Sequence, residues 1–199
     1  MSVFEQIITV SLNPAIDRII EVPNFTIGAH QRGRQLSRHP AGKATGFVGR
    51  NEVEQFERFL SSGRTNSQFL AVDGATRENV TIVDPTARQE THIRDVGFVV
   101  SQRELTRLKK KLHLICRPTS LVIFSGSMPP GIGAEQFVEL VQLCLHAQAK
   151  VAVDTSGPAL QAVARLSLWL VKPNVAELAE IVGQPIHSDD QIVATGCQL

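Results

Sequence analysis

The sequence predicts an α/β fold in which a mostly parallel sheet is flanked by helices. From Val80 onward, short apolar runs alternate with helical patterns, which is the order typical of a parallel sheet. The chain has 199 residues, 43% of them hydrophobic and 20% charged, as in one ordinary globular domain. Polar residues follow the apolar runs directly, at the edge where ligands bind in open parallel sheets.

Six short apolar runs predict the strands. Most are flanked by Gly, Pro, Ser or Asp, as expected for strands buried on both faces of a sheet. They are Ile7–Leu12, Gln68–Val72, Val80–Val83, Leu121–Phe124, Val151–Val153 and Leu168–Val171. A further segment, Glu90–Val96, mixes polar and apolar residues, which predicts a strand with one wet face or a small accessory sheet.

Five segments with apolar residues at helical spacing predict the helices. The second of them begins with Ser101 and Glu104, the spacing of a capping box. Its three consecutive lysines, Lys109 to Lys111, are interpreted as a solvated helix face rather than a phosphate site. The predicted helices are Glu52–Leu60, Ser101–Cys116, Ala134–Gln148, Pro158–Leu166 and Val175–Val182.

Charge and cysteine content narrow the class of protein. The net charge is +1, from 20 basic and 19 acidic residues, which gives no reason to expect nucleic acid or a membrane surface as partner. No apolar run approaches the roughly 18 residues of a membrane span. Three scattered cysteines fit reduced thiols. We therefore expect a cytoplasmic protein that binds neither nucleic acid nor membrane.

Two loops begin like nucleotide-binding fingerprints, and neither is complete. In the loop that ends in Lys43, Ser37 stands where a P-loop needs its first glycine and Ala44 replaces the Ser or Thr. Gly131-Ile132-Gly133 starts like a dinucleotide fingerprint, but Gln136 occupies the third glycine position. The sequence therefore favours neither a P-loop nucleoside triphosphatase nor an NAD-binding enzyme.

Candidate binding residues follow the first predicted strand. Asp17 can accept hydrogen bonds from sugar hydroxyls, although the preceding Asn13-Pro14 is equally typical of a plain turn. Gly42 and Lys43 lie in a small-residue loop, where backbone N–H groups and an ammonium can meet a phosphate or a polar sugar.

Three more candidates lie beside later strands. Arg77 offers a planar charged fork suited to phosphate, and Asn79 can fix a sugar hydroxyl; the alternative for Arg77 is an ordinary surface arginine. Ser127 lies in a Ser-Gly-Ser turn followed by two prolines, which is a candidate anion-binding turn.

The last candidates follow Val171. Lys172 can neutralise nucleotide phosphate charge. Asn174 and Glu177 share one face at a predicted helix start, where they can hold waters around Mg²⁺. The same spacing is that of a capping box, so both interpretations stay open.

Taken in order, these motifs resemble one family. The resemblance is to the PfkB/ribokinase-like carbohydrate kinases, nearest to the 1-phosphofructokinase and tagatose-6-phosphate kinase branch, and it extends from Ile7 to about Val182. The motifs that carry it are SLNPAID, AGK, GFVGR, TRENVTIVD, FSGSMPPG, VDTSG and VKPNVAEL.

The resemblance implies a fold, a reaction and a set of site residues. It implies a single ribokinase-like domain with a small β lid, drawn from about 18–38 and 88–96, through whose strands a homodimer can form. It also implies transfer of the γ-phosphoryl group of ATP, with Mg²⁺, to a hexose phosphate, most naturally fructose 1-phosphate to fructose 1,6-bisphosphate. By resemblance, Asp17, Gly42 and Lys43 contact the sugar, and Arg77 and Ser127 contact the substrate phosphate with Asn79 beside them. Lys172 contacts the nucleotide phosphate. Asn174 and Glu177 act on Mg²⁺ and phosphate, Glu177 through water.

Two departures from the family pattern concern activity. After Lys43 the family pattern continues through a helix and most of a strand that do not occur here, together with a substrate-binding asparagine. The GAGD motif, which supplies the catalytic base, does not occur in the 199 residues, so the base is unassigned. We therefore expect either an incomplete relative or part of a longer protein. The alternative to a kinase is a non-catalytic relative that binds sugar phosphate or only oligomerises.

Overall fold

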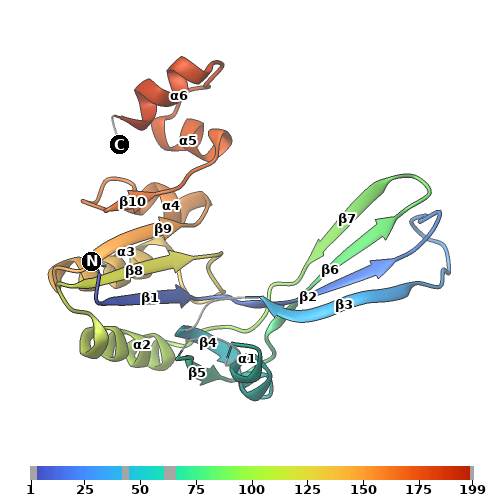
Figure 1. The fold of residues 1–199 in the computed structure, drawn as a ribbon, viewed down its shortest axis with the longest axis horizontal. Coiled ribbons are helices and arrows are strands. Elements are labelled where there is room, and N and C mark those ends of the chain that lie inside the picture. The colour runs from blue at the N-terminus through green and yellow to red at the C-terminus, as the bar shows by residue number, and fades with distance from the viewer. Residues whose placement is uncertain (1–3, 42–44, 61–65, 198–199) are drawn as a thin grey trace.

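The chain forms two sheets, one of which projects from the side of the other (Figure 1). The computed structural model describes residues 4–41, 45–60 and 66–197. Within them, six strands form the main sheet and four form the projecting sheet. None of the helices in these ranges is long and apolar enough to cross a membrane.

The main sheet is parallel throughout and has the order β10-β9-β8-β1-β4-β5. This arrangement confirms the predicted fold class, and five of the six predicted strands lie in this sheet. Its strands are β1 (Gln6–Ser11), β4 (Thr45–Gly49), β5 (Gln68–Val72), β8 (Ser120–Ser125), β9 (Lys150–Asp154) and β10 (Leu170–Val171).

All five predicted helices are present within a few residues of their expected ends. The capping box predicted for the second is formed, because Ser101 Oγ accepts from Glu104 N and the Glu104 carboxylate accepts from Ser101 N. One helix, α6, was not expected from the sequence. The helices are α1 (Val53–Leu60), α2 (Gln102–Ile115), α3 (Ala134–His146), α4 (Gly157–Val163), α5 (Val175–Val182) and α6 (Asp189–Gly196).

One core joins the main sheet to α2 and α3. Phe124 of β8 meets Phe137 of α3 edge to face, with ring centroids 5.5 Å apart. Leu108 of α2 and Val10 of β1 are fully buried in the same cluster. Each side chain of this size contributes about 1.5–3 kcal/mol when it is fully buried, so this core anchors the ends of the strands that carry the candidate residues.

The register of β4 explains how the projecting sheet connects to the main one. β3 ends at Ala41, and β4 begins at Thr45 beside Val10, so only two residues of β1 pair with β4. Because β4 starts at the end of β1, no helical crossover is needed between them. Gly46 permits this approach: its φ is +137°, and a Cβ there would lie 1.8 Å from the carbonyl oxygen of Ser11.

The projecting sheet, which we call the lid, has the order β3-β2-β6-β7. Its strands are β2 (Ala15–Glu21), β3 (Arg34–Ala41), β6 (Arg77–Asp84) and β7 (Gln89–Arg94). Both predicted lid segments lie in it, and β7 confirms the expected accessory strand. Val80–Val83 is a strand as predicted, but the expected burial on both faces of the main sheet was wrong, because this run belongs to β6 of the lid and is half-buried. A run of four residues does not specify which of two sheets it joins.

Candidate functional site

A cavity of about 260 Å³ opens where the end of β1 meets the lid. Its lining comes from three parts of the chain: the segment that leaves β1, strands β2, β3 and β6 of the lid, and the turn after β8. We call it the junction cavity. It is lined by Ser11, Asn13, Pro14, Ala15, Asp17, Ala41, Arg77, Asn79, Ser125 and Gly126.

Asp17 and Asn79, two separately predicted sugar contacts, meet in this cavity on neighbouring strands. The parallel register of β2 and β6 places them opposite each other, and Asn79 Nδ2 donates to Asp17 Oδ1 over 3.0 Å. Asn79 Oδ1 is buried and has no hydrogen-bond partner within the described part of the chain. A buried acceptor without a donor is costly, so this oxygen is suited to a ligand hydroxyl.

Arg77 enters the cavity from the first residue of β6. Its Nε donates to the carbonyl oxygen of Asn13 over 3.1 Å, which fixes the plane of the half-buried guanidinium. Burial lowers the pKa of Arg77, and nearby Arg94 lowers it further, while Asp17 and Asp95 act in the opposite direction. A positive group that is partly desolvated beside a second arginine is stabilised by an anion.

Asn13 is the site residue that the sequence reasoning missed. Only 4% of it is exposed, and its Nδ2 lies 3.5 Å from Ser127 Oγ and 3.4 Å from the Met128 carbonyl. Its own carbonyl holds Arg77. Asn13 thus links the two residues predicted to bind the substrate phosphate. Its position before Pro14 had suggested only a turn, and no local pattern distinguishes the two roles.

Gly97 gives these side chains the room that they need. Its φ is +82°, and a Cβ added to it would lie 3.0 Å from Arg77 Cβ and 3.3 Å from Asn13 Oδ1. Asn13 Oδ1 is the second buried oxygen of the cavity without a partner in the described ranges.

A second cavity continues along the lid and shares Asp17 and Asn79 with the first. Its volume is about 310 Å³, and His39, His92 and Arg94 are among its lining residues. The predicted residues Gly42 and Lys43 lie outside the described residues; Ala41, which precedes them, lines the junction cavity.

The remaining candidates, Lys172, Asn174 and Glu177, form what we call the α5 group. Lys172 Nζ lies 2.9 Å from Asp154 Oδ1 at the end of β9, and the two side chains are 66% and 45% exposed. The hydrogen bond and charge of Asp154 raise the pKa of Lys172. Ser125 lies between the two sites, because it lines the junction cavity and its Oγ is 3.5 Å from Asp154 Oδ2.

Asn174 and Glu177 form the capping box that their spacing allowed. Asn174 Oδ1 accepts from Glu177 N over 2.9 Å, and Glu177 Oε2 accepts from Asn174 N over 2.8 Å. In the described ranges, no group of three His, Cys, Asp or Glu side chains is placed to hold a metal ion. A single carboxylate is suited only to a Mg²⁺ ion that takes most of its ligands from phosphates and water molecules.

Comparison with known proteins identifies the family. The model of the pfkB family carbohydrate kinases matches residues 12–199. The chain belongs to this family. It is 34% identical to a 1-phosphofructokinase of Rhodobacter capsulatus over 91% of the chain and 63% of that protein. It is 24% identical to a tagatose-6-phosphate kinase of Staphylococcus epidermidis over 92% of the chain and 64% of that protein.

Solved structures show the same ribokinase-like fold. Phosphofructokinase-2 from Escherichia coli, in complex with fructose-6-phosphate, superposes with a TM-score of 0.87 at 22% identity, over 97% of this chain and 69% of that one. A possible 1-phosphofructokinase from Thermotoga maritima gives 0.82 at 25% identity, over 98% and 68%. The chain therefore spans about two thirds of the length of the relatives it matches.

Proposed function

We propose that the junction cavity binds a hexose phosphate as phosphoryl acceptor and that the reaction is the ATP-dependent phosphorylation of this sugar. Fructose 1-phosphate, converted to fructose 1,6-bisphosphate, is the preferred acceptor. The observation that carries the proposal is the convergence of Asp17, Arg77 and Asn79 on one cavity at the end of β1. Names of relatives such as 1-phosphofructokinase and tagatose-6-phosphate kinase support this class of acceptor.

The cavity offers separate groups for the phosphate and for the sugar. Arg77 lines the cavity, and Ser127 lies beside it with its Oγ 3.5 Å from Asn13 Nδ2. Both bind the phosphate already on the substrate, since a guanidinium and a hydroxyl both donate to phosphate oxygens. Asp17 and Asn79 bind sugar hydroxyls, the carboxylate as acceptor and the amide through its unpartnered Oδ1. Gly42 and Lys43 add sugar contacts in this proposal.

The α5 group takes the nucleotide side. Lys172 is placed to neutralise phosphate charge of ATP once it exchanges Asp154 for the nucleotide. Asn174 and Glu177 contribute near Mg²⁺, and Glu177 does so through a water molecule. The bound Mg²⁺ would neutralise charge on the phosphates during transfer.

A second candidate function is binding of the sugar phosphate without turnover. It is favoured by one observation: the 199 residues contain no GAGD sequence, the family's source of the catalytic base. Phosphoryl transfer depends on positioning and charge stabilisation, so these 199 residues by themselves would bind the sugar phosphate with little turnover.

One assay separates the two candidates. The purified chain is incubated with ATP, Mg²⁺ and fructose 1-phosphate, and ADP is followed, with tagatose 6-phosphate and fructose 6-phosphate in parallel. ADP release that is fastest with fructose 1-phosphate supports the kinase and its preferred acceptor. A thermal shift with fructose 1-phosphate but no ADP release supports the second function, and absence of both contradicts the proposal.

The lid suggests a homodimer as the partner. β3 and β7 are its edge strands, and edge strands carry unpaired backbone groups that readily join another chain. Leu36 on β3 and Ile93 on β7 are about half exposed, at 46% and 54%. We propose that two copies pair through the lid in the cytoplasm. Light scattering of the wild type and of a Leu36→Lys variant tests this, because only the wild type should have twice the chain mass.

A further inference from the structure

Two thiols lie side by side in the core, remote from both sites described above. The Sγ atoms of Cys116 and Cys144 are 3.6 Å apart. Cys116 caps the C-terminal end of α2, and Cys144 lies in the last turn of α3. Of the two, Cys144 is fully buried and Cys116 is 3% exposed. Closing this pair into a disulfide needs an approach of only about 1.5 Å, to a bond length near 2.05 Å.

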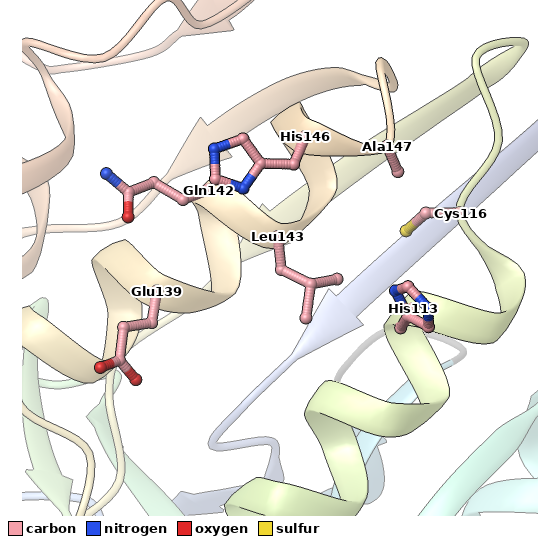
Figure 2. Close-up of a pocket in the computed structure, with 7 residues that line it drawn as sticks. All are labelled: His113, Cys116, Glu139, Gln142, Leu143, His146 and Ala147. Carbon is pink, nitrogen blue, oxygen red and sulfur yellow. The ribbon is translucent and has the colours of Figure 1, made fainter.

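A cavity of about 670 Å³ leads to one member of the pair. Figure 2 shows His113 and Cys116 at the end of α2 on one side of this cavity and residues of α3 on the other. Cys144 does not line it. The lining residues are His113, Cys116, Glu139, Gln142, Leu143, His146 and Ala147. A small polar molecule can therefore reach Cys116 but not its neighbour.

The electrostatic environment also makes Cys116 the more reactive of the two thiols. The hydrogen bond between the two thiols lowers the pKa of Cys116, and Arg117 adds to this effect against the opposing effect of burial. The same bond and burial raise the pKa of Cys144. The thiolate is the nucleophilic form of cysteine, so Cys116 is the member suited to attack and Cys144 is the one that stays protonated.

We propose that Cys116 and Cys144 form an oxidation site, in which a small hydroperoxide oxidises the pair to an intramolecular disulfide. The Cys116 thiolate attacks one peroxide oxygen; the O–O bond breaks, Cys116 becomes a sulfenic acid, and hydroxide leaves and takes up the proton that Cys116 had released. Cys144 sulfur then attacks Cys116 sulfur, and the sulfenic oxygen leaves as water with the Cys144 proton. Two thiols and one hydrogen peroxide thus give one disulfide and two waters.

The product is a covalent link between the ends of α2 and α3. Its two cysteines are 28 positions apart, so the bond closes a loop long enough to restrict the unfolded chain. The helices that carry it pack on the main sheet, away from the junction cavity. We therefore expect oxidation to stabilise the fold and to leave binding at the junction cavity unchanged.

The test uses hydrogen peroxide on the folded, reduced chain in a Cys197→Ser background, because Cys197 is the exposed third thiol. The expected product is lighter by about 2 Da, shows a Cys116–Cys144 peptide after digestion without reductant, and melts about 5–10 °C higher. Cys144→Ser should instead accumulate a sulfenic acid on Cys116, which dimedone traps. Cys116→Ser should leave Cys144 unmodified.

A cavity-filling variant tests the route. Ala147→Phe places a large side chain in the lining of this cavity and leaves both cysteines in the sequence, so it should slow disulfide formation at least several-fold while the circular dichroism spectrum stays that of the parent. Two results would overturn the proposal: a disulfide that forms only after the chain is unfolded, or peroxide oxidation of Cys144 in the Cys116→Ser variant as fast as that of the parent pair. Neither result depends on whether the chain binds sugar phosphate.

Discussion

The junction cavity and the α5 group are built in different ways. In the cavity, hydrogen bonds join segments more than 60 positions apart: Asn79 to Asp17 over 3.0 Å and Arg77 to the Asn13 carbonyl over 3.1 Å. In the α5 group, Asn174 and Glu177 cap each other within one helical turn. The junction cavity is therefore fixed by tertiary structure, whereas the capping pair of the α5 group is local and exposed.

The largest effect on sugar phosphate affinity is expected from Arg77→Ala. Loss of a charged donor to phosphate removes about 1.5–3 kcal/mol, so affinity for fructose 1-phosphate should fall roughly 10- to 150-fold. Titration calorimetry measures this. The matched control is Arg38→Ala, since Arg38 lies on β3 of the same lid and pairs with Glu78 over 2.8 Å, and neither residue lines either cavity. Equal losses in the two variants would contradict the assignment of Arg77.

Two glycine substitutions compare the regions directly. Gly97 and Gly183 have φ values of +82° and +70°, so alanine is strained at both by about 1–2 kcal/mol. Gly97→Ala also crowds Arg77 and Asn13, which should add about 1–3 kcal/mol and weaken sugar phosphate binding. Gly183→Ala has nothing within 4 Å of its new Cβ, so binding should stay unchanged. Denaturant unfolding and calorimetry on both variants measure the difference.

Asn174→Ala and Glu177→Gln separate capping from metal chemistry in the α5 group. Removing the Asn174 cap should cost about 1 kcal/mol of unfolding free energy. Glutamine can replace glutamate in a capping box, so Glu177→Gln should keep the stability. If Glu177 acts near Mg²⁺, this variant should lose the Mg²⁺-dependent part of ATP affinity. A Glu177→Gln chain that is destabilised as much as Asn174→Ala, with unchanged ATP binding, would leave Glu177 a cap only.

The smallest effect is expected from Lys172→Met. Its ion pair with Asp154 is exposed, and such pairs contribute little, so the melting temperature near pH 7 should fall only slightly. The folded pKa of Lys172 is raised above 10.5. The pair therefore stabilises the fold below that pH, and this contribution is lost as the pH rises through the folded pKa. Comparing the melting temperatures of both chains from pH 9 to 12 tests the direction: only the wild type should lose this contribution.

Sequence patterns predicted the parts of this molecule that depend on local chemistry. The capping boxes at Ser101 and Asn174 follow from spacing alone, and the structure contains both. Asp17 and Asn79 were chosen separately, and strand register brings them together. Asn13 was missed because its role depends on Arg77 and Ser127, which approach it only in the fold. Val80–Val83 was assigned to the wrong sheet because its burial depends on which strands pair beside it.

We propose that the junction cavity of this chain binds its acceptor without the nucleotide. The most direct measurement is calorimetric titration of the wild type and of Arg77→Ala with fructose 1-phosphate in the absence of ATP, with fructose as the phosphate-free control. We predict saturable binding of fructose 1-phosphate to the wild type, at least tenfold weaker binding to Arg77→Ala, and weaker binding of fructose to both. Equal affinity of the wild type for fructose and fructose 1-phosphate, or binding that Arg77→Ala does not weaken, would contradict the claim.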